Sequence, residues 1–85
     1  MSQDHAKQEI GQLTRKLRTK MKLTQMDFSK VMGFEGNNSI ISNLEAGRYD
    51  LSRAGVITLQ TLIAQHLPED SPGLLTLLED AWGRA

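Results

Sequence analysis

Four short polar side chains, two amides and two hydroxyls, lie close together in the middle of the chain: Asn38, Ser39, Ser42 and Asn43. An asparagine amide donates and accepts at once, so it can bond an adenine edge at two points, and a serine hydroxyl can meet either donors or acceptors. Side chains of these types on one exposed helix face are suited to contacting base edges in the major groove of DNA. A solvated helix surface rich in Asn and Ser is the alternative interpretation.

Two short helices joined by a glycine-containing turn would have to position these side chains. Thr24 is a good N-cap for the first helix, because its hydroxyl can accept a backbone N–H that has no partner within the helix. Gly33 ends this helix, since glycine tolerates the left-handed conformation of a C-cap. The spacing i, i+3, i+4 predicts one buried helix face made of Phe28, Val31 and Met32.

The second helix would carry the four polar residues. Its N-cap is expected at Asn37 or Asn38, and Gly47 stops it. Ile41 and Leu44 give it a narrow apolar stripe that should face the core.

This ordered set of residues resembles the Cro/repressor-type (XRE-like) helix-turn-helix family. The resemblance covers about residues 10–67 and implies an all-α, five-helix, lambda-repressor-like domain with its motif at residues 24–47. One departure is a turn that is two residues longer than usual, around Glu35 and Gly36. The matching positions are Leu23, Thr24, Gln25, Phe28, Gly33, Ile41, Ser42, Leu44, Glu45, Gly47 and Arg48.

The resemblance places Asn38, Ser39 and Asn43 on the family's main base-contacting positions. If the longer turn shifts the helix start, Asn37 takes the place of Asn38. The second helix contains no Lys or Arg, so bidentate contacts from arginine to guanine are not expected and an A·T-containing site is favoured.

Phosphate contacts supply register and much of the affinity of a DNA-binding protein. The family uses a glutamine at the position of Gln25 in this way, at the start of a helix whose free N–H groups suit an anion. Arg48, just after the second helix, is the best charged candidate. The predicted phosphate contacts are Gln25, Asn37, Arg48, Tyr49 and Arg53.

Arg18 and Glu45 match a pair of family positions at which an arginine binds a glutamate near the end of the second motif helix. Such a pair would tie the first helix of the chain to the base-contacting helix. Removing one partner of a buried pair leaves the other charge unpaired, at a cost of roughly 3–5 kcal/mol. A structural role is therefore expected for both residues.

Three further helices are predicted around the motif. Apolar residues at steps of three or four predict a first helix over residues 5–21, buried through Ile10, Leu13, Leu17 and Met21. Ser52 should cap a fourth helix over residues 53–66, with Val56, Leu59, Leu62 and Ile63 facing inward and Gly55 allowing close packing.

Ser71 as N-cap with Pro72 at the first helical position predicts a last helix over about residues 72–83. Its apolar arc is wider than one core contact requires, and exposed apolar patches mark interfaces. A homodimer interface is favoured, with core packing or a surface for a different protein as alternatives. The interface residues would be Leu74, Leu75, Leu78 and Trp82.

The net charge is zero, which is unusual for a DNA-binding domain, but the charges are segregated. Residues 1–34 hold seven Lys and Arg against three acids, a net charge of +4, and residues 35–85 hold three against seven, −4. Such a dipolar molecule can offer a basic surface to phosphate. Ordinary solvated helix faces are the alternative.

Several classes of function find no support in the residues. The chain has no cysteine, and His5 and His66 are isolated, so neither a disulfide framework nor a metal site is expected. No nucleophile–base order or phosphate-cradling glycine loop indicates an enzyme, and no cofactor or small-molecule ligand is expected. No apolar run could span a bilayer and the first residues are not a signal peptide, so a cytoplasmic, nucleoid-associated protein is expected.

These patterns together predict a sequence-specific DNA-binding regulator, a repressor that binds an inverted-repeat operator as a homodimer. Eighty-five residues suit one small domain, 1–85, whose core alone would be marginal, so dimerisation is a plausible source of stability. One alternative is an antitoxin that binds a toxin through its last helix and autoregulates its operon. Another is a helical protein-interaction module without DNA binding.

Overall fold

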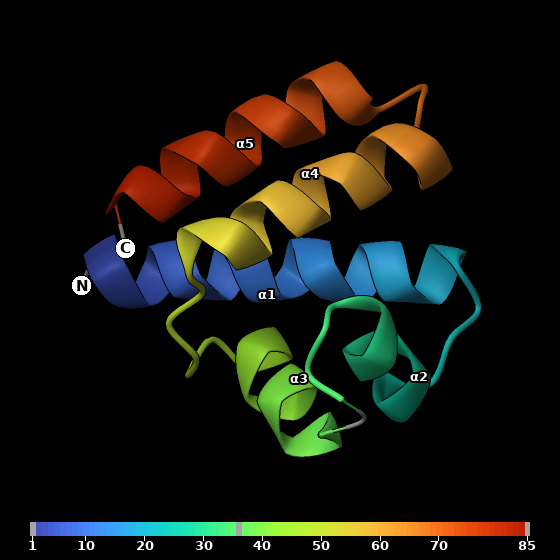
Figure 1. The fold of residues 1–85 in the computed structure, drawn as a ribbon. Coiled ribbons are helices and arrows are strands. Elements are labelled where there is room, and N and C mark those ends of the chain that lie inside the picture. The colour runs from blue at the N-terminus through green and yellow to red at the C-terminus, as the bar shows by residue number, and fades with distance from the viewer. Residues whose placement is uncertain (1, 36, 85) are drawn as a thin grey trace.

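The longest helix, α1 (Ser2–Lys20), is the element against which the others are arranged. This computed structural model describes residues 2–35 and 37–84. Helices α4 and α5 lie on one side of α1, and helices α2 and α3 lie on its other side (Figure 1). The described residues form five α-helices and no strand, so the expected all-α, five-helix class is confirmed.

The apolar stripe of α1 explains why it occupies the centre. Ala6, Ile10, Leu13 and Leu17 recur at steps of three or four and are at most 4% exposed. The helix begins at Ser2, earlier than the predicted residue 5, and ends at Lys20. Met21 lies beyond this end and is half-buried, so it contributes less to the stripe than predicted.

Helix α2 (Gln25–Val31) begins directly after its N-cap Thr24, whose hydroxyl oxygen accepts the Asp27 N–H at 3.1 Å as expected. Phe28 and Met32 are buried, but Val31 is 43% exposed, so the prediction for Val31 was wrong. The reason is the direction of the buried arc: Ser29 and the C-cap Met32 lie on one side of Phe28 around the helix axis, and Val31 lies on the other side, toward solvent.

Helix α3 (Asn38–Glu45) has the predicted apolar stripe, with Ile41 and Leu44 at most 1% exposed. It ends before Gly47, whose φ of +79° is left-handed backbone that favours glycine. The turn that leads into α3 includes Glu35, which also has a positive φ of 58°. The expected two-residue lengthening falls partly on Gly36, which lies outside the described residues.

Helix α4 (Arg53–His66) has the predicted bounds, and its four predicted inward residues are buried. Its N-cap Ser52 accepts the Gly55 N–H at 3.2 Å. A Cβ atom on Gly55 would stand 2.6 Å from Leu51 Cδ1, so this glycine makes room for a side chain of the preceding loop rather than for another helix, as had been expected.

Helix α5 (Ser71–Arg84) starts one residue earlier than predicted and runs beyond Trp82. Ser71 is not its N-cap, because the Leu74 N–H bonds to the Asp70 carbonyl at 3.0 Å and the Ser71 hydroxyl donates to the Pro68 carbonyl instead. The chain therefore enters the helix at Asp70.

The packing of α5 on α1 and α4 corrects the predicted dimer interface. Leu78 is 0% exposed, so it belongs to the core of a single chain and is not available to a partner. The indole N–H of Trp82 donates to the Leu51 carbonyl at 2.8 Å, which orients this half-buried ring. Leu74 and Leu75 are half-buried against the core, and Leu77, which was not predicted, is 39% exposed.

None of the described helices combines the length and the apolar character needed to cross a membrane.

Candidate nucleic-acid interface

The outer face of α3 carries the four polar residues that the sequence singled out. Ile41 and Leu44 turn to the core, and the residues between and beside them turn to solvent. Within the described chain, the four exposed side chains make no hydrogen bond. Their donors and acceptors are thus available to a ligand; these residues are Asn38, Ser39, Ser42 and Asn43.

Asn37 lies just outside this face and has a structural role. Its side-chain oxygen accepts the Ser39 backbone N–H at 3.1 Å, so Asn37 is the N-cap and Asn38 is the first helical residue. This settles the register at the start of α3, and Asn37 does not replace Asn38 on the outer face. The predicted phosphate contact of Asn37 is unaffected by this bond, because a phosphate oxygen accepts from the amide nitrogen and the cap uses the oxygen.

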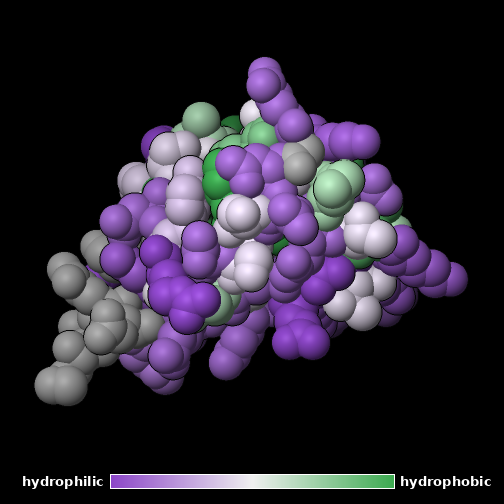
Figure 2. Space-filling model, turned by 90° about the horizontal axis from the view of Figure 1, so that it is seen from below, coloured by the Kyte–Doolittle hydropathy of each residue, from purple (hydrophilic) through white to green (hydrophobic). Residues whose placement is uncertain are grey.

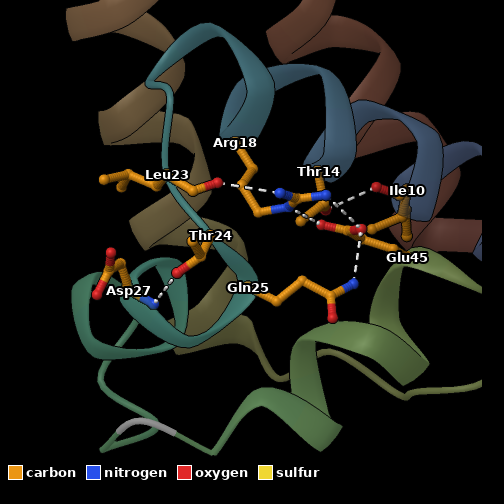
Figure 3. A network of polar contacts seen from close by, with 8 residues as sticks. All are labelled: Ile10, Thr14, Arg18, Leu23, Thr24, Gln25, Asp27 and Glu45. Atoms are coloured by element: carbon orange, nitrogen blue, oxygen red, sulfur yellow. Dashed lines mark hydrogen bonds and ion pairs between the residues drawn. The ribbon is translucent and has the colours of Figure 1, made fainter.

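A polar network holds α3 to α1 and α2 (Figure 3). Arg18 Nε donates to Glu45 Oε2 at 2.6 Å and Arg18 Nη2 to Oε1 at 3.2 Å, so the predicted ion pair is present and bidentate. The remaining guanidinium nitrogen, Nη1, donates to the Leu23 carbonyl at 3.0 Å. The side chains of Arg18 and Glu45 are only 17% and 8% exposed, so this is a largely desolvated pair with its hydrogen bonds satisfied.

Gln25 belongs to the same network, in addition to its predicted phosphate role. Its amide nitrogen donates to Glu45 Oε1 at 3.2 Å, so the side chain joins the start of α2 to the end of α3. This bond uses one of the two N–H donors of the amide, so the other can still serve the predicted phosphate contact. The direct structural function of Gln25 is to fix the angle between the two helices.

The close approach of α1 and α3 depends on a glycine that the sequence analysis did not single out. A Cβ atom on Gly11 would stand 2.5 Å from the Leu44 carbonyl oxygen and 2.6 Å from that of Glu45. Only glycine leaves room for the last turn of α3 to lie against α1 at this point. A glycine inside an otherwise good helix is the sequence signal for such an approach, because it costs about 1 kcal/mol relative to alanine.

Arg48 is exposed at the end of the motif and is the strongest of the predicted phosphate contacts. Its backbone N–H caps α3 by donating to the Asn43 carbonyl at 2.8 Å, while its guanidinium makes no ion pair with a described residue. Tyr49 follows it and is half-buried, with its ring edge-on to Phe34 at a centroid distance of 5.9 Å. Arg48 can therefore reach outward more freely than Tyr49.

Arg53 contacts α5, but its side chain is 53% exposed, so its phosphate role stays a prediction. Its guanidinium lies 5.2 Å from the centroid of the Trp82 ring and forms an ion pair with Glu79 at 3.1 Å. Gln60 also donates to Glu79, and these hydrogen bonds from Arg53 and Gln60 lower the pKa of the Glu79 carboxyl from its ordinary value. The cluster joins α4 to α5, and its positive charge is already balanced.

The molecule viewed from the side of α2 and α3 is mostly hydrophilic (Figure 2). Two apolar side chains of α2, Met26 and Val31, are about half exposed here, at 49% and 43%. A face of this kind suits a wet, polar partner better than the apolar core of an obligate protein interface.

No metal site can be assembled from the residues that the structure describes. His5 Nε2 lies 3.1 Å from Glu9 Oε1, but Glu9 also pairs with Arg84, and no group of three or more potential ligands is found in the described part of the chain.

Comparisons with known proteins add no family or relative from which a function could be inferred. No protein-family model, no curated protein and no solved structure gives a significant match to the chain.

Proposed function

We propose that this protein binds double-stranded DNA sequence-specifically, by placing the outer face of α3 in the major groove. The observation that carries the proposal is the set of four exposed amide and hydroxyl side chains on α3 that make no hydrogen bond with the described residues. Side chains of these types match the donor and acceptor pattern of base edges.

The mechanical support of α3 agrees with this function. Base discrimination requires that the contacting helix keep its place relative to the part of the protein that grips the backbone. The bonds from Arg18 and Gln25 to Glu45, and the close contact at Gly11, hold the end of α3 against α1 and the start of α2. Arg48 follows directly as a cation for phosphate.

We further infer that the five helices form a lambda-repressor-like domain and that two copies act together on an inverted repeat. The resemblance of residues 10–67 to the Cro/repressor-type family supports both inferences. Two copies related by a two-fold axis would place their α3 helices about 34 Å apart on one side of the duplex. Since Leu78 is buried within the chain, a dimer contact on α5 would rely on the half-buried Leu74, Leu75 and Trp82 and on the exposed Leu77.

A dimer bound at a promoter would act as a repressor by occupying the site that polymerase needs, in the cytoplasm where the nucleoid lies. The alternative of an antitoxin differs in a toxin partner on α5, and no contact in the structure favours it over a simple repressor.

The direct test is selection from a randomised duplex library, followed by sequencing of the bound fraction. An enriched palindrome with half-sites about one helical turn apart is the expected result. A single asymmetric half-site would retain the DNA function and reject the symmetric dimer. Absence of enrichment at low salt would reject DNA binding and favour the protein-interaction module.

A further inference from the structure

The lysines and arginines of this protein fall into two groups, those with an acidic partner and those without. Four of the ten make ion pairs: Lys7 with Asp50, Arg18 with Glu45, Arg53 with Glu79, and Arg84 with Glu9 and Asp80. The other six make no ion pair with a described residue. Four of those six line one groove: Arg15, Lys16, Lys20 and Lys22.

This groove, called here the α1 groove, runs along the second half of α1 and has a volume of about 720 Å³. Its other wall includes Leu67 and Asp70 from the connection between α4 and α5, which lies at the same end of the molecule as the end of α1 (Figure 1). Asp70 is the one acid among its lining residues, so four basic side chains and a single acidic one form its wall. Like charges held together in a concave surface create a positive potential that attracts an anionic partner.

The α1 groove faces a different direction from the outer surface of α3. Arg18 points toward α3, and Lys20 follows it by two residues, which is about 200° of rotation on an α-helix. Lys22 lies between the two regions, because it leaves the end of α1 and precedes Gln25 by three residues. The groove therefore begins beside the α2–α3 surface and leads away from it around the end of α1.

We propose that the α1 groove binds the phosphate backbone of DNA that flanks the site contacted by α3, with the duplex bent toward the protein. This inference rests on the proposed function. A nucleic acid fits the groove better than a second copy of this chain. The acidic side chains with which a second copy could bind the groove are either already in ion pairs or scattered over several elements. Lys16 and Lys20 are about 6 Å apart along α1, so they can face different phosphates of one strand. Gln12 and Thr19, which also line the groove, add uncharged donors for phosphate oxygens.

The test compares two duplexes: the site enriched from the library alone, and the same site with about 10 bp, roughly one helical turn, added on each side. Affinity of the full chain for each is measured across salt concentrations. The groove variant is R15Q/K16Q/K20Q, whose three substituted side chains are exposed. The control variant is I57E/A64E/T76E, which changes the net charge by the same amount at exposed positions of α4 and α5 that do not line the groove.

On the flanked duplex, the wild-type protein should show a salt dependence steeper than that of the groove variant. Each phosphate contact contributes about 0.9 to the slope of log K against log salt, so three lost contacts lower it by about 2.7. Between about 50 and 200 mM salt, the wild-type protein would then lose about 40-fold more affinity than the variant. On the bare site, the slopes of the wild type and the groove variant should agree. The control variant should behave as wild type on both duplexes. The variant K16R/K20R keeps both positive charges and should therefore bind as tightly as wild type.

Equal slopes for wild type and groove variant on the flanked duplex would overturn the proposal. So would an equal change in the control variant, because the effect would then come from net charge rather than from the groove. Binding of poly-glutamate by the wild type and not by the groove variant, with unchanged DNA slopes, would assign the groove to an acidic protein instead. In each of these cases enrichment of a defined site would still uphold DNA binding by α3, whereas no enrichment would remove both proposals.

Discussion

Gly11 of α1 and Leu44 of α3 meet so closely that a Cβ atom on the glycine would stand 2.5 Å from the leucine carbonyl oxygen. Gly11→Ala should therefore destabilise the protein by about 1–3 kcal/mol, the usual cost of overpacking, despite the better helix propensity of alanine. Urea unfolding measures this change. Gly73→Ala is the matched control, because its Cβ would meet no atom within 4 Å, and it should stabilise by up to about 1 kcal/mol. Equal stabilities of the two variants would contradict the close contact.

The pair of Arg18 and Glu45 should respond asymmetrically to substitution. Arg18→Met leaves a carboxylate that is 8% exposed without its main partner, and a loss of roughly 3–5 kcal/mol is expected in the fully buried limit. The double variant R18M/E45M should recover part of this loss, because no unpaired charge remains. A double-mutant cycle of unfolding free energies measures the coupling. Strictly additive losses would show that the pair does not act as a unit.

Ser29 is a buried residue whose hydroxyl has no hydrogen-bond partner among the described residues. An unsatisfied buried hydroxyl costs about 1–3 kcal/mol, so Ser29→Ala should raise the free energy of unfolding. Thr14→Val is a useful contrast, since the buried Thr14 hydroxyl donates to the Ile10 carbonyl at 2.7 Å. That variant should be neutral or less stable than wild type by about 1 kcal/mol. If both substitutions raised the free energy of unfolding, the Thr14 hydroxyl would not be better hydrogen-bonded than the Ser29 hydroxyl.

Glu79 gives the stability a defined dependence on acid pH. Hydrogen bonds from Arg53 and Gln60 lower the pKa of Glu79 in the folded protein, so the carboxylate stabilises the fold above the unfolded pKa of about 4.3. This contribution is lost as the pH falls from there through the lowered folded value. Wild type should therefore exceed Glu79→Gln in stability at neutral pH, and the difference should shrink on acidification. Denaturant titrations of both proteins over this range measure it, and a constant difference would refute the assignment.

Asn38 and Asn43 should govern base preference rather than stability. Replacing either by alanine removes a two-point donor and acceptor, so discrimination at one base pair should fall by about 1–3 kcal/mol. The unfolding free energy should change little, since both side chains are exposed. Repeating the library selection with each variant identifies the affected position. An unchanged consensus would mean that α3 does not contact bases.

The sequence predicted the helices well because their caps and apolar stripes are local signals. Thr24, Asn37 and Ser52 each lie within two or three residues of the N–H that they accept, so no tertiary contact is needed to place them. The start of α5 was misplaced because Ser71 and Asp70 are both capable caps, and the choice depends on the turn at Pro68.

The long-range partners could not be predicted from local pattern. An apolar arc on α5 indicates burial but does not identify the surface that covers it. The pattern favours a second chain for Leu78, whereas the structure buries this residue where α5 packs on α1 and α4. The pattern also holds no signal for the bond from Trp82 to the Leu51 carbonyl. Arg53 likewise has no sequence signal for its contact with Trp82 and Glu79, which are separated from it by more than 25 residues. The pairing of Arg18 with Glu45 was predicted only through the family resemblance.

The four outer residues of α3 make no side-chain bonds to the described chain, while the residues beneath them carry all of its attachment. Binding preference and folding are thus encoded in separate sets of positions on the same short helix. During evolution, single substitutions at Asn38, Ser39, Ser42 or Asn43 can therefore accumulate while each successive variant stays folded. Under the proposed function, a duplicated copy of this gene could diverge to a new DNA site in a few steps, with its scaffold left unaltered.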